Sequence, residues 1–563
     1  MKFIVYDFEV FKYDWLVVLK ELEKEPVVIV NDPEALRKFY EENKTNLFVG
    51  YNNKYYDDHI LKGILSGLDP KLINDWIIVD RKSGWMFPGM KRYYIASMDL
   101  MQDVLALSLK EAEGNMGMSI EESSVDFNID RKLTDEELKE VIMYCKHDVA
   151  ATEQLMKARE SYLKSKLILI NMYNLPITDA GKTSAQLTAT ILGAHKKSYY
   201  DEMFYDYPEK LKLKDQEIID NYVSPLDYNR TLDKDVCGVP HRLAYGGLHG
   251  AIKGIFEGDL MHIDVTSYYP SMMINLGFMS RSLRVPGKFK EIYDTRVKLK
   301  ANKDPRQKAF KLILNSTYGA MKNQYNPLHD PKQCNQICIT GQLFLLDLLE
   351  KLEPYIDLIQ SNTDGLIVRA KDKDKVYECV KEWEDRTGFK MECDDISKIW
   401  QKDVNNYIVL MKNGDIEVKG GYVRNFNGGN FQQNSNTIID KAVVEYFVNN
   451  IPVEETINNC NDVIKFQMIT KKGPTYSHVT HEVNGKEVKV NNVNRVFATK
   501  DTSYGTLYKH KTNGRKDKSP GVPENCIVCN KEISNYTIDI IDKDWYIKQA
   551  KDRINDFLKE DKK

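Results

Sequence analysis

The sequence has few of the features that mark a membrane protein or a secreted protein. Among its 563 residues there is no apolar run long enough to cross a bilayer. Only nine residues are cysteine, and they are scattered, which is usual in reducing compartments. The first seven residues turn acidic too early for a signal peptide. We therefore expect a protein with no membrane partner that stays in the cytoplasm where it is translated.

Two pairs of cysteines are close in sequence, Cys334 with Cys338 and Cys526 with Cys529. A lone C-x-x-C without a partner pair is weak support for a zinc site. We expect reduced thiols at all four positions.

An excess of charge of one sign is also missing, because the net charge is only −3. This does not exclude a nucleic-acid partner, since binding follows the local field and not the total charge. The densest basic stretch consists of Lys509, His510, Lys511, Arg515, Lys516 and Lys518. It fits a loop that contacts phosphates as well as a solvated loop, and charge alone does not decide between them.

The length exceeds what one hydrophobic core supports, so we expect two to four domains. No internal repeat or low-complexity segment stands out. Strand-like and helix-like segments alternate over the first 160 residues, with strands at residues 2–6 and 46–51. A long helix is predicted at residues 135–163, opened by a capping box of Thr134 and Glu137.

Later segments mix strands and helices, which predicts an α/β and α+β multidomain chain. A strand at residues 260–265 leads into a turn that contains Pro270. A helical hairpin follows, and we expect its second helix to begin with Asp304 as cap and Pro305 at the first position. From residue 355 on, the pattern predicts a β-hairpin.

The first group of candidate catalytic residues is acidic. Asp7 and Glu9 lie two apart at the end of a strand and share a face. Asp57 follows an asparagine-rich segment, and Tyr144 and Asp148 share a face at helical spacing. Four carboxylates and a tyrosine are suited to two divalent cations about 4 Å apart, which activate water and stabilise a leaving oxygen.

The second group combines acidic and basic residues. Asp264 ends the strand that precedes the Pro270 turn, whose backbone N–H groups are suited to phosphate. Lys311 shares a helical stripe with Asn315 and Tyr318, and Asp364 lies at the tip of the hairpin. Each fragment alone is ordinary, and Asn-Thr-Asp-Gly is a good plain turn. Their order along one chain is what favours a site.

The acidic group resembles the three exonuclease motifs of the DnaQ-like proofreading domains of DNA polymerases. In this sequence the motifs are Asp7-x-Glu9, the segment from Asn52 to Asp57, and Tyr144-x-x-x-Asp148. The resemblance implies an RNase H-like exonuclease domain whose metal ligands are Asp7, Glu9, Asp57 and Asp148. Tyr144 would orient the attacking water and Asn53 would contact DNA. Asp58 adjoins Asp57, and we favour Asp57 as the ligand.

The second group resembles family B DNA polymerases over residues 2 to about 425. Four motifs contribute: Asp264-x-x-Ser267-x-Tyr269-Pro270-Ser271, Lys311-x-x-x-Asn315-Ser316-x-Tyr318-Gly319, Asn362-Thr363-Asp364, and Tyr245-Gly246-Gly247, which is one residue shorter than the Tyr-x-Gly-Gly of the family. The resemblance implies a right-hand polymerase with palm, fingers and thumb. Its compactness is typical of a bacteriophage enzyme.

The implied domains follow the motifs along the chain. They are an exonuclease domain at residues 1–160, a connecting region and start of the palm at 161–255, palm at 256–285 and 326–425, fingers at 286–325, and a thumb and C-terminal region at 426–563.

The resemblance also implies roles for single residues. Asp264, its neighbour Val265 and Asp364 would hold the catalytic metals. The incoming triphosphate would be bound by Lys311, with Arg296 and Lys300 as weaker candidates. Tyr269 would stack under the deoxyribose and exclude a 2′-hydroxyl, and Asn315, Tyr318 and Gly319 would line the nascent base pair. DNA contacts would come from Tyr245, Gly246, Gly247, Tyr407 and Lys419.

Two departures from the family motifs affect these expectations. Asn362 replaces the first aspartate of the hairpin motif, but the second aspartate is the direct ligand in the family, so activity is still expected. The Lys-x-Tyr element becomes Asn405-Asn406-Tyr407, which removes a cation near the primer. Lys419 is a candidate substitute.

The expected function is template-directed DNA synthesis with 3′→5′ proofreading in phage DNA replication, by a monomer. The expected cofactor is Mg²⁺ or Mn²⁺, two ions per active site. Expected partners are primer–template DNA and deoxynucleoside triphosphates, with a helicase, a single-strand binding protein or a processivity factor as further candidates. The alternatives are a nuclease with an inactive polymerase body and a non-catalytic DNA-binding replication factor.

Spacing also bears on priming. Protein-primed family members carry two long insertions, whereas here Asp264 and Lys311 are 47 positions apart and Asn315 and Asp364 are 49 apart. We therefore expect extension of an ordinary nucleic-acid 3′-hydroxyl, with modest, salt-sensitive processivity.

Overall fold

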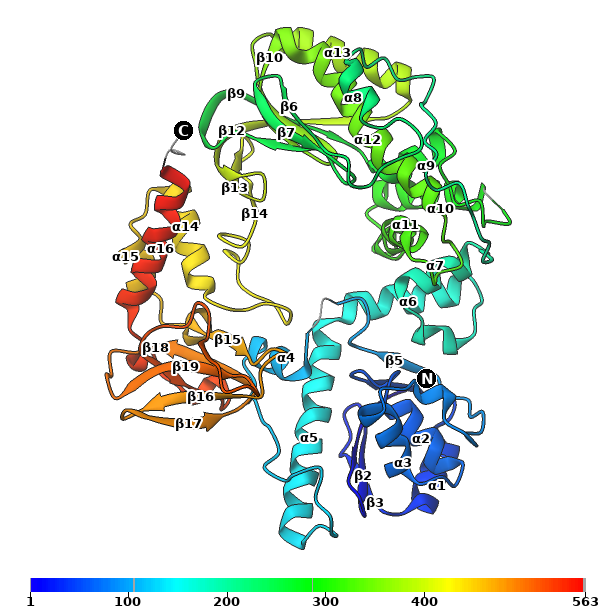
Figure 1. Cartoon of the computed structure of the whole chain (residues 1–563), viewed down its shortest axis with the longest axis vertical. Coiled ribbons are helices and arrows are strands. Elements are labelled where there is room, and N and C mark those ends of the chain that lie inside the picture. The colour runs from blue at the N-terminus through cyan, green and yellow to red at the C-terminus, as the bar shows by residue number, and fades with distance from the viewer. Residues whose placement is uncertain (1, 105–106, 286, 560–563) are drawn as a thin grey trace. The chain divides into compact units, whose positions relative to one another are not determined.

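The computed structural model describes residues 2–104, 107–285 and 287–559. The chain forms two compact units, each assembled from three separate segments. The first unit contains Met1–Thr183, Gly428–Ile438 and Ile457–Tyr546, and the second contains Ser184–Asn427, Ile439–Thr456 and Ile547–Lys563. In Figure 1 the first unit includes the blue helices and strands and the orange strands. None of the described helices is both long and apolar enough to span a membrane.

The first unit is built around a five-stranded sheet in the order β3-β2-β1-β4-β5. The strands are β1 (Phe3–Val10), β2 (Trp15–Glu21), β3 (Val27–Val30), β4 (Leu47–Gly50) and β5 (Ser97–Asp99). β1 is antiparallel to β2 and parallel to β4. Both predicted strands are confirmed, and β1 is longer than expected.

Helices cover both faces of this sheet because the side chains of β1 alternate in direction. Tyr6 and Phe8 pack with residues of α1 (Pro33–Asn43) and α2 (Asp57–Leu65). Val5 packs on the opposite face against α5 (Asp135–Ala158). Asp7 and Glu9 have the same parity as Val5 and therefore face α5.

The predicted capping box is present at the start of α5, where Thr134 and Glu137 cap each other's backbone N–H groups. The predicted helical stretch over residues 135–163 is confirmed, but it is divided into two helices. α5 ends at Ala158, and α6 (Glu160–Met172) begins after Arg159. The buried guanidinium of Arg159 donates a hydrogen bond to the carbonyl of Leu100, which ties the break to the end of β5.

The first unit also contains seven strands from residues 457–546. They form a three-stranded sheet and a four-stranded sheet that share a small core including Val479, Val496 and Leu507. The strands are β15 (Met468–Lys471), β18 (Val493–Ala498) and β21 (Cys526–Val528), and β17 (Lys486–Val490), β16 (His478–Val483), β19 (Tyr504–His510) and β20 (Lys516–Lys518).

Arg495 of β18 connects these strands to the N-terminal segment of the same unit. Its side chain is completely buried, and burial lowers its pKa to about 10. The guanidinium donates to Gln467 Oε1 at 2.8 Å, to the carbonyl of Lys531 at 2.6 Å and to the carbonyl of Met118 at 2.7 Å. A further bond of 3.2 Å reaches the carbonyl of Gly114, in α4 (Leu109–Asn115). One side chain thus fixes the end of α4 against β18.

The other elements of the first unit are short. They are α3 (Pro70–Asn74), the π-helical turn η1 (Asp75–Val79), and the 3₁₀ turns η2 (Gly84–Met86), η3 (Ile177–Gly181), η5 (Val463–Phe466), η6 (Ile533–Asn535) and η7 (Ile538–Ile540).

The second unit is built around a nine-stranded sheet in the order β14-β13-β12-β9-β11-β10-β8-β7-β6. The strands are β6 (Leu232–Val236), β7 (Val239–Leu243), β8 (His249–Ala251), β9 (Gly254–Val265), β10 (Ile356–Asn362), β11 (Gly365–Ala370), β12 (Met391–Asp403), β13 (Asn406–Met411) and β14 (Ile416–Lys419). The predicted strand at residues 260–265 is the end of β9, and the predicted hairpin is β10–β11.

Helices of the second unit separate the strands along the chain. They are α7 (Ser184–Ile191), α8 (Gln216–Asp220), α9 (Tyr268–Asn275), α10 (Gly287–Ala301), α11 (Gln307–Lys322), α12 (Pro331–Leu352), the 3₁₀ turn η4 (Glu353–Tyr355) and α13 (Lys373–Thr387). Three further helices contain a residue at which the chain passes from one unit to the other: α14 (Thr437–Asn449), α15 (Val453–Asn458) and α16 (Lys543–Leu558).

Two local predictions for the second unit are wrong. Pro270 lies in the first turn of α9, where a missing N–H costs nothing, and not in a turn before the helix. α11 begins at Gln307 and not at Pro305. The side chain of Asp304 does accept the N–H of Arg306, but in a turn that precedes the helix. The predicted helical hairpin itself is confirmed as α10 and α11.

We predict that Arg495→Ala will destabilise the first unit. Removing the guanidinium leaves several buried carbonyl groups without a donor, each at a cost of about 1–3 kcal/mol, so a loss of about 3 kcal/mol is expected. Hydrogen exchange measured by mass spectrometry should show faster exchange in α4 and β18. The matched control is Arg515→Ala, an exposed arginine paired with Asp517, which should leave the stability nearly unchanged. Equal effects of both substitutions would contradict this role.

Candidate active sites

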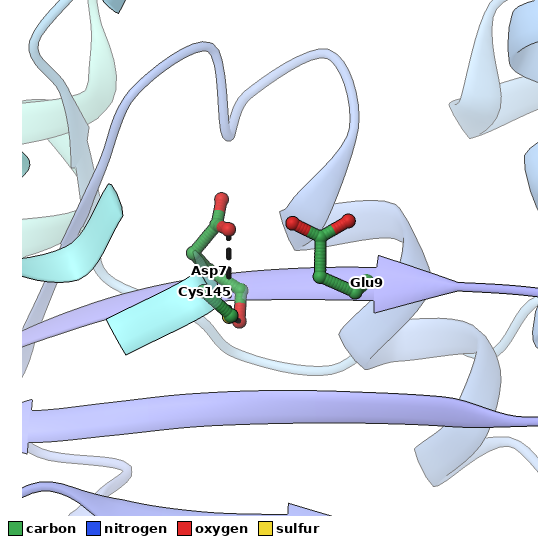
Figure 2. A group of neighbouring side chains, drawn as sticks. All are labelled: Asp7, Glu9 and Cys145. Carbon is green, nitrogen blue, oxygen red and sulfur yellow. Dashed lines mark hydrogen bonds between the residues drawn. The ribbon is translucent and has the colours of Figure 1, made fainter. Parts of the chain in front are cut away.

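The first acidic group lies between β1 and α5 of the first unit. Ligand atoms of Asp7, Glu9 and Cys145 all lie within 4.8 Å of one another. Figure 2 shows both carboxylates on the same side of β1, with Cys145 next to Asp7. The thiol of Cys145 donates to Asp7 Oδ2 at 3.5 Å and to the carbonyl of Asp7 at 3.4 Å. Cys145 is not predicted from the sequence, because a thiol inside a helix gives no distinct signal.

Asp148 of α5 has a partner that the sequence did not predict. Its carboxylate accepts a hydrogen bond from the ammonium of Lys110 in α4. Lys110 Nζ also lies 3.0 Å from Glu113 Oε1 and 4.6 Å from the ring centroid of Tyr144. Tyr144 and Asp148 thus share a face, as predicted, and Lys110 lies against both. Only tertiary packing brings Lys110 here from 38 positions away.

Asp57 and Asp58 have different surroundings at the start of α2. Asp57 Oδ1 accepts the N–H of Phe8 at 3.0 Å, which fixes Asp57 to β1 between Asp7 and Glu9. The carboxylate of Asp58 instead accepts hydrogen bonds from other groups, namely Tyr6, Asn53 and Ser97. Asn53 is completely buried in this network, so in this structure its side chain is not accessible to DNA.

Burial dominates the electrostatics of the first group, and repulsion between the carboxylates adds to it. Burial, then the charge of Asp148, raises the pKa of Asp7 to about 8. Burial also raises the pKa of Asp148 to about 6, against the opposing effect of Lys110. The pKa values of Glu9 and Asp57 are raised by burial and by the charge of Asp7.

The donor set suits a hard divalent cation. Burial raises the pKa of the Cys145 thiol well above its usual value, so the thiol stays protonated and is a poor ligand. The four carboxylates supply oxygen ligands of the kind that Mg²⁺ and Mn²⁺ prefer. A bound cation would also relieve the repulsion among them.

The second acidic group lies at one end of the nine-stranded sheet. Asp264 of β9 is opposite Gly365 of β11 on one side and Glu392 of β12 on the other. The N–H of Val265 donates to the carbonyl of Asp364 at 2.8 Å. Register therefore brings Asp264 beside Asp364 and beside Glu392, which the sequence did not indicate.

The two-residue turn of the β10–β11 hairpin presents Asp364. Thr363 has a φ of +57°, and Asp364 is exposed at the tip. Burial, followed by the charges of Asp364 and Glu392, raises the pKa of Asp264 to about 7. Loss of water around the carboxylate of Asp364 raises its pKa, and His262 and Lys419 oppose that rise. This group too could accommodate a divalent cation.

The glycine-rich segment packs against the hairpin tip. The N–H of Thr363 donates to the carbonyl of Leu248 at 2.8 Å. A Cβ atom on Gly247 would lie 2.5 Å from Thr363 Oγ1, so a larger residue would displace the tip. The carbonyl of Gly246 accepts a hydrogen bond from Gln342 at 2.9 Å. Tyr245 of the same segment is half-buried.

Lys419 and Tyr407 are directly opposite each other on β14 and β13. Because Lys419 opposes the rise in the pKa of Asp364, its charge acts on the second acidic group. This position fits the expected substitute for the missing cation.

The predicted stripe on α11 faces solvent. Lys311, Asn315 and Gly319 are exposed, and a Cβ atom on Gly319 would meet open space. Tyr318 is half-buried, with its ring centroid 4.8 Å from that of Tyr269. These residues leave an open surface beside two packed aromatic rings.

The two cations of α10 differ. Arg296 reaches Ser267 Oγ at 3.5 Å, just beyond the end of β9, and its buried Nε has no partner among the described residues. Lys300 is exposed on the same helix.

The basic stretch at residues 509–518 is largely neutralised by nearby carboxylates. The pairs are Lys511 and Arg515 with Asp517, His510 and Lys516 with Glu487, and Lys518 with Glu524. The pairing favours the solvated loop over the loop that contacts phosphates. The close cysteines are all buried; Cys338 donates to the carbonyl of Gly246 and Cys526 to that of Gly505.

Comparisons with known proteins add little to this geometry. No family model matches the chain, and no curated protein matches it. Among solved structures, the chain is similar to the family B DNA polymerase from the hyperthermophilic archaeon Pyrobaculum calidifontis. The identity is 14%, the match covers 100% of this chain and 79% of that chain, and the TM-score is 0.41. A similarity this small leaves the functional argument to the residues themselves.

We predict that Lys110 and Asp148 are energetically coupled. In metal-free buffer Lys110→Met should destabilise the chain by about 3 kcal/mol, because it leaves buried carboxylates without a counter-charge. In an Asp148→Asn background the same substitution should cost about half as much or less. Denaturant unfolding measures both values. Lys139→Met, on the exposed face of α5, is the control and should have little effect. Additive effects of the two substitutions would contradict the coupling.

Proposed function

We propose that the chain is a DNA-directed DNA polymerase with a 3′→5′ proofreading exonuclease. The observation that carries the proposal is the register that sets Asp264 beside Asp364 at the end of the nine-stranded sheet. A second, separate group of carboxylates on β1, α2 and α5 supports the proofreading activity. Two acidic groups in two compact units are better explained by two reactions at phosphodiester bonds than by a single reaction.

We assign the carboxylates to metal binding. In the polymerase site the ligands are Asp264, Asp364 and the carbonyl of Val265, with Glu392 beside them. In the exonuclease site they are Asp7, Glu9, Asp57 and Asp148. A pair of Mg²⁺ or Mn²⁺ ions in each site would activate the attacking oxygen and stabilise the leaving oxygen.

In synthesis the residues of the chain bind and orient the substrates. Lys311 binds the triphosphate from α11, with Arg296 and Lys300 contributing from α10. The positive charges offset the charge that develops during phosphoryl transfer. Tyr269 supports the deoxyribose from below.

The remaining contacts of synthesis are to the base pair and the DNA. Asn315, Tyr318 and Gly319 line the new base pair, and the open space at Gly319 leaves room for a flat base. The primer strand contacts Tyr407 and Lys419. The segment from Tyr245 to Gly247 holds the hairpin tip and lies next to the DNA.

In proofreading the protein positions water and controls charge. Tyr144 orients the attacking water. Lys110 keeps Asp148 ionised and directed toward Asp7, because its ammonium donates directly to that carboxylate. We revise the role of Asn53, which is buried, from a DNA contact to a residue that holds Asp58 and the start of α2 in place.

We retain the division into exonuclease, palm, fingers and thumb at the expected boundaries, and the expected role in phage replication. Between Asp264 and Lys311 the described residues form α9 and α10, and between Asn315 and Asp364 they form α12 and β10. These elements leave no segment for a priming insertion among the described residues. We therefore infer that the chain extends the 3′-hydroxyl of an ordinary nucleic-acid primer.

We predict that the two activities can be separated by mutation. On a primer with a mismatched 3′ end, Asp7→Ala with Glu9→Ala should slow degradation by about a thousandfold, since the metals lose two ligands worth several kcal/mol. Extension of a matched primer should stay within a factor of about two to three. Asp364→Asn should give the reverse pattern. Retained degradation without extension in the wild-type chain would favour the nuclease alternative, and loss of both activities in either folded variant would contradict separate sites.

We predict that Tyr269 enforces the choice of deoxynucleotides. Tyr269→Val should raise the ratio of ribonucleotide to deoxynucleotide incorporation by about tenfold or more, which is the range expected for one steric contact. Single-nucleotide extension with matched concentrations of each triphosphate measures the ratio. Tyr200→Val, which removes an exposed ring elsewhere in the second unit, is the control. An unchanged ratio would mean that another side chain excludes the 2′-hydroxyl.

A further inference from the structure

A segment of the first unit between α3 and β5 exposes an unusual number of large apolar side chains. Trp85 is 73% exposed and Tyr94 is 50% exposed, and Ile78, Val79 and Met86 are exposed as well. Tryptophan is normally well buried, so an exposed tryptophan among other exposed apolar side chains indicates a candidate binding surface. The segment begins with the π-helical turn η1, a type of turn that is frequent at functional sites.

Cations without a partner among the described residues alternate with these apolar residues along the sequence of the segment. Arg81, Lys91 and Arg92 are exposed, and among the described residues none of their side chains has a hydrogen bond or an ion pair. Lys82 is different: it pairs with Asp80 at 2.9 Å and lies 4.2 Å from the ring centroid of Trp76. Three positive charges are therefore available to an external anion.

The contrast with the basic stretch at residues 509–518 is informative. There, most cations lie within 4 Å of a carboxylate of the same unit, such as Asp517 or Glu487. Paired charges produce little field beyond the surface, whereas unpaired charges attract a polyanion. The stretch that is more basic in sequence is thus the weaker candidate for binding phosphates.

The segment is held in place by contacts within itself and by contacts to α2 and to Ser66, which follows α2. Trp76 Nε1 donates to the carbonyl of Ser83 at 3.1 Å, and the N–H of Lys91 donates to Ser66 Oγ at 3.0 Å. A Cβ atom on Gly84 would lie 2.5 Å from the ring of His59, so Gly84 packs directly on α2. Because the backbone under Trp85 is fixed, binding through its ring requires little further ordering.

We propose that this surface, defined by Arg81, Trp85, Lys91, Arg92 and Tyr94, binds single-stranded DNA. Unpaired bases stack on Trp85 and Tyr94, and the phosphates between them contact the three cations, which is the combination that single-strand binding proteins use. A duplex hides its base faces and cannot stack on these rings. His59, which packs under Gly84, follows Asp57 by two residues on α2, so the segment that carries the surface packs against the helix that carries Asp57.

The choice of DNA over RNA rests on the proposed function, but the binding itself does not require synthesis or cleavage. An anionic lipid surface also attracts exposed tryptophan and basic residues. The surface is assigned to a nucleic-acid strand because its segment packs against α2, the helix that carries Asp57 of the carboxylate group suited to phosphodiester chemistry.

The test is the affinity of the full chain for a fluorescent oligothymidylate of about 16 nucleotides. Anisotropy is measured in a buffer with a metal chelator, so that no strand is degraded. Trp85→Ala should weaken binding about tenfold with an unchanged salt dependence, because stacking is lost and charge is not. The triple variant Arg81→Ala, Lys91→Ala, Arg92→Ala should also bind at least about tenfold more weakly. Its plot of log affinity against log salt should be shallower by about 2, from three phosphate contacts at about 0.7 each.

Matched controls separate this surface from general effects. The variant Lys511→Ala, Arg515→Ala, Lys518→Ala removes the same formal charge from the paired stretch and should bind as the wild type does. Tyr200→Ala removes an exposed ring of the second unit and should also have no effect. Circular dichroism and thermal unfolding check that each variant is folded.

A second readout follows Trp85 directly. Iodide quenches the fluorescence of exposed tryptophan. The oligonucleotide should protect a fraction of this fluorescence from iodide in the wild type, and the protected fraction should disappear in Trp85→Phe. Oligonucleotide affinity that is unchanged in both the Trp85 variant and the triple variant would overturn the proposal. The proposal would also be overturned if vesicles of phosphatidylcholine and phosphatidylserine bound the variants more weakly than the wild type, while the oligonucleotide affinity stayed the same. A chain that binds the strand through these residues but neither extends nor degrades DNA would leave this proposal standing and refute the proposed function.

Discussion

Burial of carboxylates that lie close together is the constraint on which both candidate sites depend. Asp7 and Glu9 project from one side of β1, and Asp264 lies beside Asp364 at the end of β9. Each group loses water and gains like-charged neighbours, which is why the pKa values of Asp7 and Asp264 rise to about 8 and about 7. Such carboxylates stay close together only if the backbone segments that carry them are fixed. β1 lies between β2 and β4, and β9 lies between β11 and β12, so both strands are bonded on both edges.

Each unit offsets part of this effect with positive charge from another element. Lys110 donates directly to Asp148, and His262 and then Lys419, on the edge strand β14, oppose the rise in the pKa of Asp364. Neither lysine neutralises its group completely, since the net shifts remain upward. The remaining negative charge is what a divalent cation would bind.

Local patterns in the sequence were enough for the parts of the molecule that local rules determine. The capping box at Thr134, the strand that ends at Asp264 and the hairpin around Asp364 depend on short-range spacing and turn chemistry. The sequence-based start of α11 was two residues early, since the turn that Asp304 caps precedes the helix. Lys110, Glu392 and Cys145 were missed because strand register and helix packing, which bring distant residues together, leave no periodic signal. Burial of Asn53 was missed for the same reason, and Arg495 could not be identified as the link between β18 and α4.

The central claim, two separate carboxylate groups that each bind divalent metal, is tested most directly by affinity cleavage with iron. Fe²⁺ that replaces Mg²⁺ generates hydroxyl radicals under ascorbate and peroxide, and the radicals cut the polypeptide next to the bound ion. The account predicts two sets of cuts, one near Asp7, Asp57 and Asp148, the other near Asp264, Asp364 and Glu392. Excess Mg²⁺ should suppress both, Asp7→Ala with Glu9→Ala should abolish only the first, and Asp364→Asn only the second. Cuts spread evenly along the chain, or confined to one of the two groups, would contradict it.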